Sequence, residues 1–269
     1  MKIHKNKTVA FLFAGAFFFL PVSAVYARAD TTWERISSYT TYYNASERGR
    51  SHNIECAVAC IDGVTLQPYG EFSFNKTVGK RTAEAGYQQA KIIVNGEYVQ
   101  GVGGGVCQVS TTLYNAVLKS GLVVEEYHPH SLQVSYVAPS RDAMVSSDCD
   151  LRFFNPHDFP VRVQASAQKG GLKVTILGQK IKYRYELVST VLAEIAPPPP
   201  QIVEGEKEEI LRSPKRGVKS EAYIERYLGN SLVERKRLRT DEYRAIQGVI
   251  VKKIDNPQNK IPSNCCVFP

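Results

Sequence analysis

The chain has 269 residues, of which 43% are hydrophobic and 22% charged, so it is long enough for one or two domains and has the composition of a globular protein with a real core. Its formal net charge of +8 points to anionic partners. It contains no phosphate-binding loop with a lysine, no serine nucleophile elbow and no dinucleotide fingerprint, which argues against the functions that depend on those motifs.

The first 27 residues have the pattern of a secretory signal peptide. Three lysines precede an apolar run over residues 9–20, and the small-residue pattern of a cleavage site ends at Ala27. The run is short for a membrane-spanning helix, although an uncleaved anchor is an alternative. We therefore expect a protein that is secreted or associated with the cell envelope.

Removal of this segment takes away its three lysines and lowers the net charge from +8 to +5. We expect an exported basic protein to meet an anionic cell wall or lipid surface and no nucleic acid. A positive charge of this size can also serve solubility alone. The sequence does not indicate an oligomeric state.

Periodicity and turn signals predict two main helices among short strands. One helix is expected over residues 51–62, where apolar residues recur at helical spacing from Ile54 and Gly63 follows as a stop, and the other runs to about Ser120, before Gly121. Asn95-Gly96 predicts a hairpin. The predicted strands lie at residues 37–43, within 66–75, and at 90–94, 98–102, 122–124, 132–137, 151–154, 161–165, 172–177 and 183–195. The fold class is therefore α+β, a mostly antiparallel sheet with two main helices, followed by a small β-hairpin module.

Composition also suggests the domain boundaries. They are a signal peptide (1–27), a main domain (28–180), a β-strand and proline-rich linker (181–200), a small β module (201–254) and a flexible tail (255–269). Four prolines at 197–200 make a stiff spacer. The module contains Gly229-Asn230, a second hairpin signal, but it has few large apolar residues, so we expect it to lean on the main domain.

Six cysteines follow the signal: Cys56, Cys60, Cys107, Cys149, Cys265 and Cys266. An exported chain can form disulfides, but the pairing cannot be read from the sequence. If Cys107 is free, at least one other cysteine is unpaired as well. Cys56 and Cys60 share one helical face, where they could contact a metal or bridge elsewhere. The lack of a CxxC partner motif argues against a metal pair, and we expect no metal or cofactor.

Residues 103–114, GGGVCQVSTTLY, form the most informative stretch of the chain. Three glycines lead into Cys107, and a thiol in the first turn of a helix is favoured as thiolate by the helix dipole. The glycines allow several backbone N–H groups to turn toward one point. A nucleophile beside converging donors is the minimum for acyl transfer. The alternative is a buried structural cysteine or half of a disulfide.

Helical spacing places Cys107 off the apolar stripe that runs from Val106 to Val117. The cysteine shares its face with Ser110, Thr111 and Tyr114. We therefore expect the thiol to open onto a polar cleft that is lined by hydroxyl groups.

Several motifs occur in the order typical of the VanW-like domain family, which the chain resembles over about residues 37–178. They are Phe72-Ser73-Phe74-Asn75, Gly79-Lys80-Arg81-Thr82, Gly86-Tyr87, the block from Gly103 to Asn115, His130-Ser131, Asp142-Ala143 and Asp150-Leu151. The block from Gly103 is long and specific. The C-terminal segment resembles a degenerate version of the G-five β module.

The resemblance implies a cysteine L,D-transpeptidase that cross-links peptidoglycan stem peptides, with Cys107 at the position of the family's nucleophile. It implies His130 as the base, with His128 as second choice. Asp142 or Asp150 would hold the histidine tautomer. The expected substrate and oxyanion contacts are Gly104, Gly105, Gln108, Ser110, Thr111, Tyr114 and His128.

Plainer interpretations stay open for these residues. The histidines could lie on the surface beside a proline turn, and the aspartates could form turns or caps. The sequence departs from the family pattern at Tyr69, Ser140 and Met144, and Cys149 beside Asp150 could bridge to Cys107.

Two other functions also stay open. One is a non-catalytic peptidoglycan-binding module, in which the glycine loop and the helix dipole hold a stem-peptide carboxylate. The other is metal-dependent hydrolysis with His128, His130 and Cys107 as ligands.

Overall fold

The structure is a computed structural model that describes residues 32–94 and 96–253. The predicted signal peptide (1–27), the predicted tail (255–269) and the Cys265-Cys266 pair lie outside the described residues. Within the described ranges, every helix is too short or too polar to cross a membrane.

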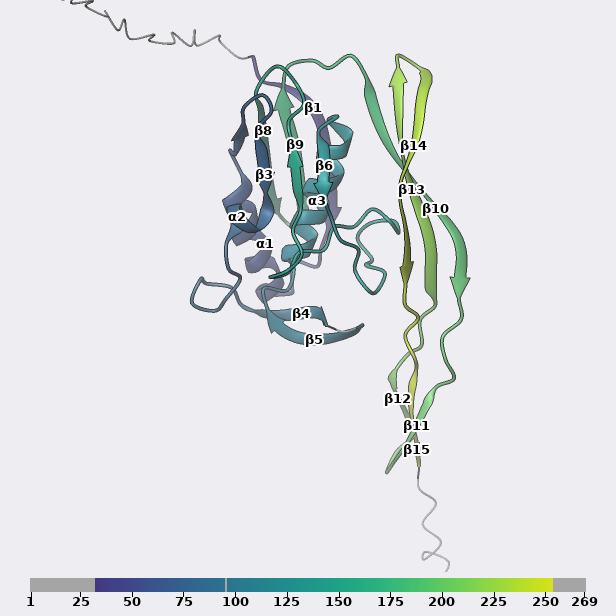
Figure 1. The fold of residues 1–269 in the computed structure, drawn as a ribbon. Helices are drawn as coiled ribbons and strands as arrows, with labels where there is room; N and C mark the ends of the chain where they lie inside the picture. The colour runs from purple at the N-terminus through teal and green to yellow at the C-terminus, as the bar shows by residue number, and fades with distance from the viewer. Residues whose placement is uncertain (1–31, 95, 254–269) are drawn as a thin grey trace, which may run out of the picture. The chain divides into compact units, whose positions relative to one another are not determined.

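The described chain forms three helices among short, mostly antiparallel strands (Figure 1). The helices are α1 (Arg48–Ile61), α2 (Phe74–Val78) and α3 (Val106–Lys119). The strands of the N-terminal part are β1 (Glu34–Tyr42), β2 (Thr65–Leu66), β3 (Glu71–Ser73), β4 (Gln89–Val94), β5 (Glu97–Val102), β6 (Val123–Glu126), β7 (Arg152–Phe154), β8 (Val161–Gln168) and β9 (Gly171–Gly178). Those of the C-terminal part are β10 (Arg184–Ile195), β11 (Gln201–Gly205), β12 (Glu209–Arg212), β13 (Gly217–Leu228), β14 (Ser231–Tyr243) and β15 (Val249–Lys253).

The N-terminal part is built on an antiparallel sheet with the order β1-β9-β8-β2. Helix α3 packs against β1 and β9, and α1 packs against β8 (Figure 1). A smaller antiparallel sheet, β3-β7-β6, and the β4-β5 hairpin complete this part. The α+β class, with a mostly antiparallel sheet and two substantial helices, is therefore confirmed.

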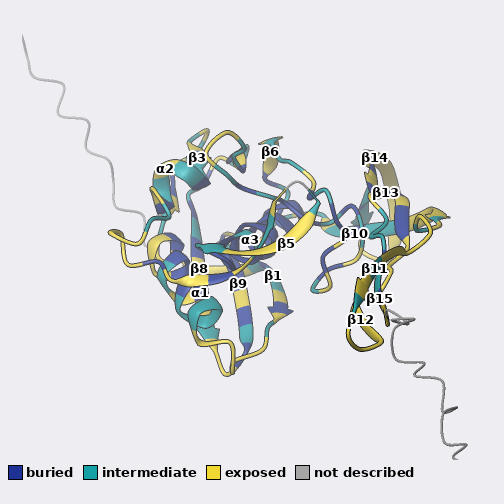
Figure 2. Ribbon diagram, turned by 90° about the horizontal axis from the view of Figure 1, so that it is seen from below, coloured by how far each residue is buried: buried dark blue, intermediate teal, exposed yellow. Residues whose placement is uncertain are grey.

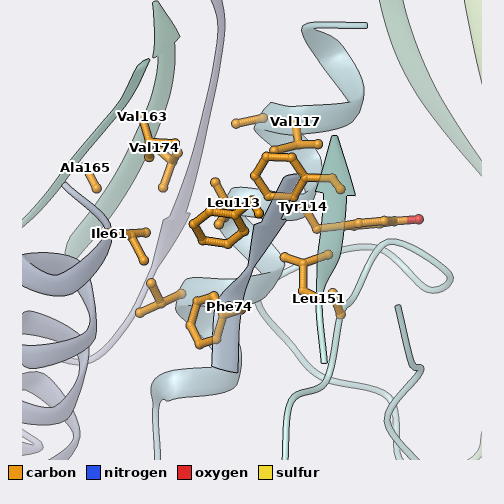
Figure 3. Packing of buried hydrophobic residues seen from close by; sticks show 14 of the residues in the cluster. Ile61, Phe74, Leu113, Tyr114, Val117, Leu151, Val163, Ala165 and Val174 are labelled. Atoms are coloured by element: carbon orange, nitrogen blue, oxygen red, sulfur yellow. The ribbon is translucent and has the colours of Figure 1, made fainter. Parts of the chain in front are cut away.

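Helix α3 lies at the centre of the core. Its apolar stripe is buried, and Leu113 and Val117 belong to one hydrophobic cluster with Phe74 of α2 and Val174 of β9 (Figure 3). Figure 2 shows the same helix largely in the buried class. The helix ends as predicted, because Gly121 follows it with φ 76°, a left-handed conformation that glycine adopts without strain.

The C-terminal β module, defined here as residues 184–253, contains two three-stranded sheets. Their orders are β10-β13-β14, which is antiparallel, and β11-β15-β12, in which β11 and β15 run parallel. The sequence predicts residues 181–200 as a linker, but strand β10 within them pairs with β13 along its length. Leu187 of β10 is buried in the same hydrophobic cluster as α3. The module therefore shares the core of the N-terminal part.

One local prediction was wrong. Residues 132–137 form no strand, although Leu132 and Val134 are buried while Gln133 between them is exposed. This alternation imitates a strand, but the backbone has no ladder partner. The strand predicted within residues 66–75 is confirmed as β3, which ends at Ser73. The Ser73 hydroxyl accepts a hydrogen bond from Lys76 N (3.1 Å) and caps α2.

Candidate functional site

The glycine turn before α3 is held by close packing. A Cβ at Gly104 would lie 2.7 Å from the Lys91 carbonyl oxygen, so only glycine fits there. Gly105, the N-cap, has φ 109°. The buried Asn53 amide of α1 donates to the Gly104 oxygen at 3.0 Å. The start of α3 is therefore fixed against α1 and β4.

Cys107 is the second residue of α3 and is partly buried on the wall of a cleft. Its sulfur lies 3.3 Å from the Val145 carbonyl oxygen. The segment that carries Val145 also carries Asp142. The thiol therefore faces the loop that holds the predicted acid.

His130 and Asp142 form a buried pair, with 5% and 1% of their side chains exposed. Asp142 Oδ2 lies 2.7 Å from His130 Nδ1 and also accepts the His130 backbone N–H at 2.7 Å. Two contacts from one carboxylate oxygen fix both the ring and its backbone. The engagement of Nδ1 leaves Nε2 for the thiol, which is the arrangement expected of a histidine that serves a nucleophile.

The pKa values of these three groups shift in the directions of a thiolate-imidazolium pair. Burial raises the pKa of the Cys107 thiol, but hydrogen bonding to His130 and the charge of its ring outweigh burial, and the net pKa is lowered. Burial lowers the pKa of His130, whereas its hydrogen bonds with Asp142 and Cys107 raise it to about 9. Burial raises the pKa of Asp142, but the His130 contact and nearby Arg239 lower it overall. Such a thiol is chemically competent as a nucleophile.

The hydroxyl groups predicted to line the cleft are buried instead. Ser110 and Thr111 have no exposed surface, and Tyr114 is 1% exposed. The Ser110 hydroxyl donates to the Ala143 oxygen, and Thr111 Oγ1 accepts from Ala143 N at 3.0 Å. The expectation of an open hydroxyl-lined face was wrong because this face of α3 anchors the His130–Asp142 loop (residues 127–151).

The remaining predicted residues lie at separate places. Asp150 accepts from the Ser73 hydroxyl and from the Asn75 backbone N–H (2.8 Å), so it caps α2, whereas the partner of His130 is Asp142. His128 is half-exposed and contacts Glu126 at 3.0 Å.

Gln108 is buried between α3, β1 and α1. It donates to Thr41 and to the Tyr42 oxygen and accepts from Arg50 at 2.7 Å. Since its amide is engaged on both sides, it holds the floor of the site. Roles in substrate binding for these residues stay predictions.

Sequence reasoning missed two residues of β14 that contact Asp142. The Tyr243 hydroxyl donates to Asp142 Oδ1, and Arg239 Nη1 donates to the Asp142 backbone oxygen at 2.7 Å. Both side chains are buried. Arg239 lies 97 residues and Tyr243 lies 101 residues from Asp142 along the chain, so no spacing or motif could have indicated the contacts.

The cleft beside Cys107 and His130 has a volume of about 1140 Å³. The β4-β5 hairpin lines one side with Ile92 and Tyr98, and the loop lines another with Tyr136. Its charged lining is mostly basic: Arg50, Lys80, Arg81 and Lys91, with Glu47 as the acidic residue. The cleft therefore suits a ligand with carboxylate groups.

The cysteines of the described ranges form no disulfide with one another, so the possible bridge between Cys107 and Cys149 is not made. Bridges to Cys265 or Cys266 lie outside the described residues. Over the same ranges, no three His, Cys, Asp or Glu side chains come together as a metal-binding group, and His128 does not join Cys107 and His130 in one.

Fold and site define the class of this protein: an α+β domain in which a cysteine and a histidine line a basic cleft and a buried aspartate contacts the histidine. Residues 49–177 match the family model described as VanW like protein, and through this domain the chain belongs to the VanW-like family.

Two curated relatives are similar to it. The chain is 37% identical over 190 residues to the uncharacterized protein YoaR of Bacillus subtilis (strain 168), covering 68% of this chain and 61% of that one. It is 27% identical over 122 residues to the Vancomycin B-type resistance protein VanW of Enterococcus faecalis (strain ATCC 700802 / V583), covering 42% and 43% of the two chains. The chain thus spans less than two thirds of either relative's length.

Part of the chain also matches a solved G5 domain structure, HP0197-G5. The match covers 27% of this chain and 99% of that one, with 17% identity and a TM-score of 0.15.

Proposed function

We propose that this VanW-like protein is an exported, cysteine-dependent acyl transferase that cross-links peptidoglycan stem peptides as an L,D-transpeptidase. The observation that carries the proposal is the placement of Cys107 beside the buried His130–Asp142 pair on a basic cleft. Family membership supports the substrate class, since a relative is a resistance protein against vancomycin by name.

In the first half-reaction the Cys107 thiolate attacks the carbonyl carbon of the third residue of a tetrapeptide stem. The bond from that carbon to the nitrogen of the terminal D-alanine breaks. The His130 imidazolium gives its proton to the departing nitrogen, so D-alanine leaves with a neutral amino group and its carboxylate, and a thioester remains on the sulfur.

In the second half-reaction an amine from a neighbouring stem attacks the thioester. Neutral His130 takes a proton from this amine, a new amide bond forms, and the sulfur leaves as thiolate. Asp142 keeps the ring oriented through both steps, because its contact with Nδ1 is compatible with the charged and the neutral imidazole.

Backbone N–H groups at the start of α3 can stabilise the oxyanion. Val106 N and Gln108 N donate to the oxygens of Gly103 and Gly105. The N–H of Cys107, in contrast, donates to no backbone oxygen outside α3 among the described residues. A first-turn N–H beside the attacking sulfur is the donor that acyl transfer requires.

The test is intact-mass spectrometry of protein lacking residues 1–27, after exposure to a muropeptide with a tetrapeptide stem, with Cys107→Ala as control. We expect a thioester-sized adduct on the wild type alone, together with released D-alanine. A folded wild type with a free thiol that gives neither product would contradict the proposal.

A non-catalytic peptidoglycan-binding module is the second candidate, and the basic lining of the cleft favours it independently of the cysteine. Under this function Cys107→Ser retains stem-peptide binding, whereas substitution of Lys80 or Arg81 by Ala weakens it. Isothermal titration with the same muropeptide measures this binding. D-alanine release that is present in the wild type and abolished in Cys107→Ser indicates the transferase, and binding without release in the wild type indicates the binding module.

A further inference from the structure

The loop that carries His130 and Asp142 has little regular structure of its own. Between β6 and β7, residues 127–151 contain only an isolated bridge from His128 to Met144. A buried ion pair on such a loop must be held from outside. On one side α3 holds Ala143, whose oxygen accepts from the Ser110 hydroxyl and whose N–H donates to Thr111 Oγ1.

The other side of the loop is held by the C-terminal β module at four successive points. Arg244 N donates to the Ser131 oxygen at 2.9 Å, next to His130. The Ser189 hydroxyl donates to the Pro139 oxygen. Ser220 and Ser140 join through their hydroxyls at 2.8 Å, and Tyr243 donates to Asp142. These contacts come from β10, β13, β14 and the residue after β14.

At Asp142 the contacts become specific for the carboxylate. Its Oδ2 serves His130, while its Oδ1 accepts from Tyr243, a side chain that is 1% exposed. The Tyr243 hydroxyl in turn accepts the Ser140 backbone N–H at 2.7 Å. The hydroxyl therefore bridges the backbone of the loop and the acid that the loop carries.

Arg239 adds positive charge behind the same acid. Its Nη1 donates to the Asp142 backbone oxygen, and its buried Nη2, which has no hydrogen-bond partner among the described residues, lies 3.6 Å from Asp142 Oδ1. Asp241 accepts from Arg239 Nε at 2.6 Å, and the guanidinium lies 4.7 Å from the centre of the Tyr127 ring. These contacts fix the guanidinium in one orientation, and a buried carboxylate needs such a partner to stay ionised.

We propose that Tyr243 and Arg239 are positioning residues that act through Asp142, so that the C-terminal β module completes the Cys107 site of the VanW-like domain. This inference rests on the proposed function in one respect: the reaction that the Cys107 site performs. The contacts of Tyr243 and Arg239 with Asp142, and their effect on the thiol, do not depend on the substrate.

The experiment measures the rate of Cys107 alkylation by iodoacetamide against pH in wild type and Tyr243→Phe. Loss of the hydroxyl leaves Asp142 Oδ1 without its buried donor. Asp142 then orients His130 less firmly, and His130 stabilises the Cys107 thiolate less. We expect the apparent thiol pKa to rise, with alkylation at pH 6 about tenfold slower. Tyr223→Phe of β13, whose hydroxyl contacts Glu221, is the matched control and should leave the profile unchanged.

A double-mutant cycle separates positioning from a purely structural role. If Tyr243 acts through Asp142, Tyr243→Phe should change the profile in the wild type and add nothing in the Asp142→Asn background. Arg239→Lys, which keeps the charge but loses the fork between Asp142 and Asp241, should shift the profile in the same direction by less.

Two results would overturn the inference. One is an unchanged profile in folded Tyr243→Phe and Arg239→Lys, and the other is a shift of equal size in the Asp142→Asn background. Circular dichroism shows whether each variant is folded, and if Tyr243→Phe is not, Arg239→Lys decides. Absence of an acyl adduct in the muropeptide assay would reject the proposed reaction and leave this alkylation test intact.

Discussion

At the scale of single residues, the site depends on a balance between burial and hydrogen bonding at Cys107, His130 and Asp142. Burial alone favours the neutral form of each group. The contacts between them reverse that preference, lowering the thiol pKa and raising the pKa of His130 to about 9. The contacts therefore favour a thiolate at Cys107 beside an imidazolium at His130.

These pKa directions set a pH window for turnover. Activity should rise as pH increases through the lowered pKa of Cys107, because thiolate forms. It should fall as pH increases through about 9, because His130 loses the proton that it donates. The pH dependence of D-alanine release checks this expectation, and full activity well above pH 9 would contradict it.

Substitution of the histidine tests the same balance without substrate. In His130→Asn the thiol should return toward its ordinary pKa of about 8.5, so that alkylation at pH 6 slows by about tenfold or more. His128→Asn is the matched control, since that ring contacts Glu126 and not the thiol. Indistinguishable profiles for His130→Asn and wild type would remove His130 from the site.

At the scale of secondary-structure elements, short helices and loops depend on side chains that arrive from elsewhere. Helix α2 has five residues and begins where the Asp150 carboxylate accepts the Asn75 N–H and the Ser73 hydroxyl. Asp142 makes comparable contacts with the His130 backbone and ring. Two aspartates that were equivalent candidates in sequence thus serve different elements.

This assignment predicts that substitution of Asp150 affects stability, whereas substitution of Asp142 affects the reactivity of Cys107. Asp150→Ala should lower the free energy of unfolding by about 1 kcal/mol, because the partly buried Asn75 N–H and Ser73 O–H donors lose a charged acceptor. It should leave the pH profile of Cys107 alkylation unchanged, whereas Asp142→Asn should alter that profile. Asp148→Ala, at an exposed neighbour, is the control for stability. Chemical denaturation and alkylation rates measure the two effects.

At the scale of the whole molecule, the C-terminal β module and the VanW-like domain share one hydrophobic cluster. Leu187 of β10 is 7% exposed and belongs to that cluster, and Ile224 and Leu238 pack against it. The buried polar contacts to the His130–Asp142 loop lie beside this packing. We therefore expect the two parts to unfold together.

Leu187→Ala tests this expectation. Loss of the buried side chain should cost about 2–5 kcal/mol. The lower melting temperature should appear in the fluorescence of Trp33, the single tryptophan, which lies under Arg162 in the N-terminal part. Leu192→Ala on the same strand, where the side chain is 48% exposed, is the control. A Trp33 transition that does not move with Leu187→Ala would show independent unfolding.

Local signals in the sequence determined much of this protein. Helical spacing and a following glycine located α1 and α3, and Asn-Gly and Gly-Asn pairs located two hairpins. The glycine-cysteine block placed Cys107 in the first turn of a helix and indicated the VanW-like family. These features depend on residues close together along the chain, where periods of 3.6 and 2 are visible.

The tertiary structure alone decided which groups surround Cys107. It placed Asp142 rather than Asp150 at His130, buried Ser110 and Thr111 beneath the loop, and brought Tyr243 to the acid from 101 residues away. The alternation at residues 132–137 predicted a strand where the backbone finds no partner. Contacts between distant segments depend on how whole surfaces pack, and they leave no periodic trace in the order of the residues.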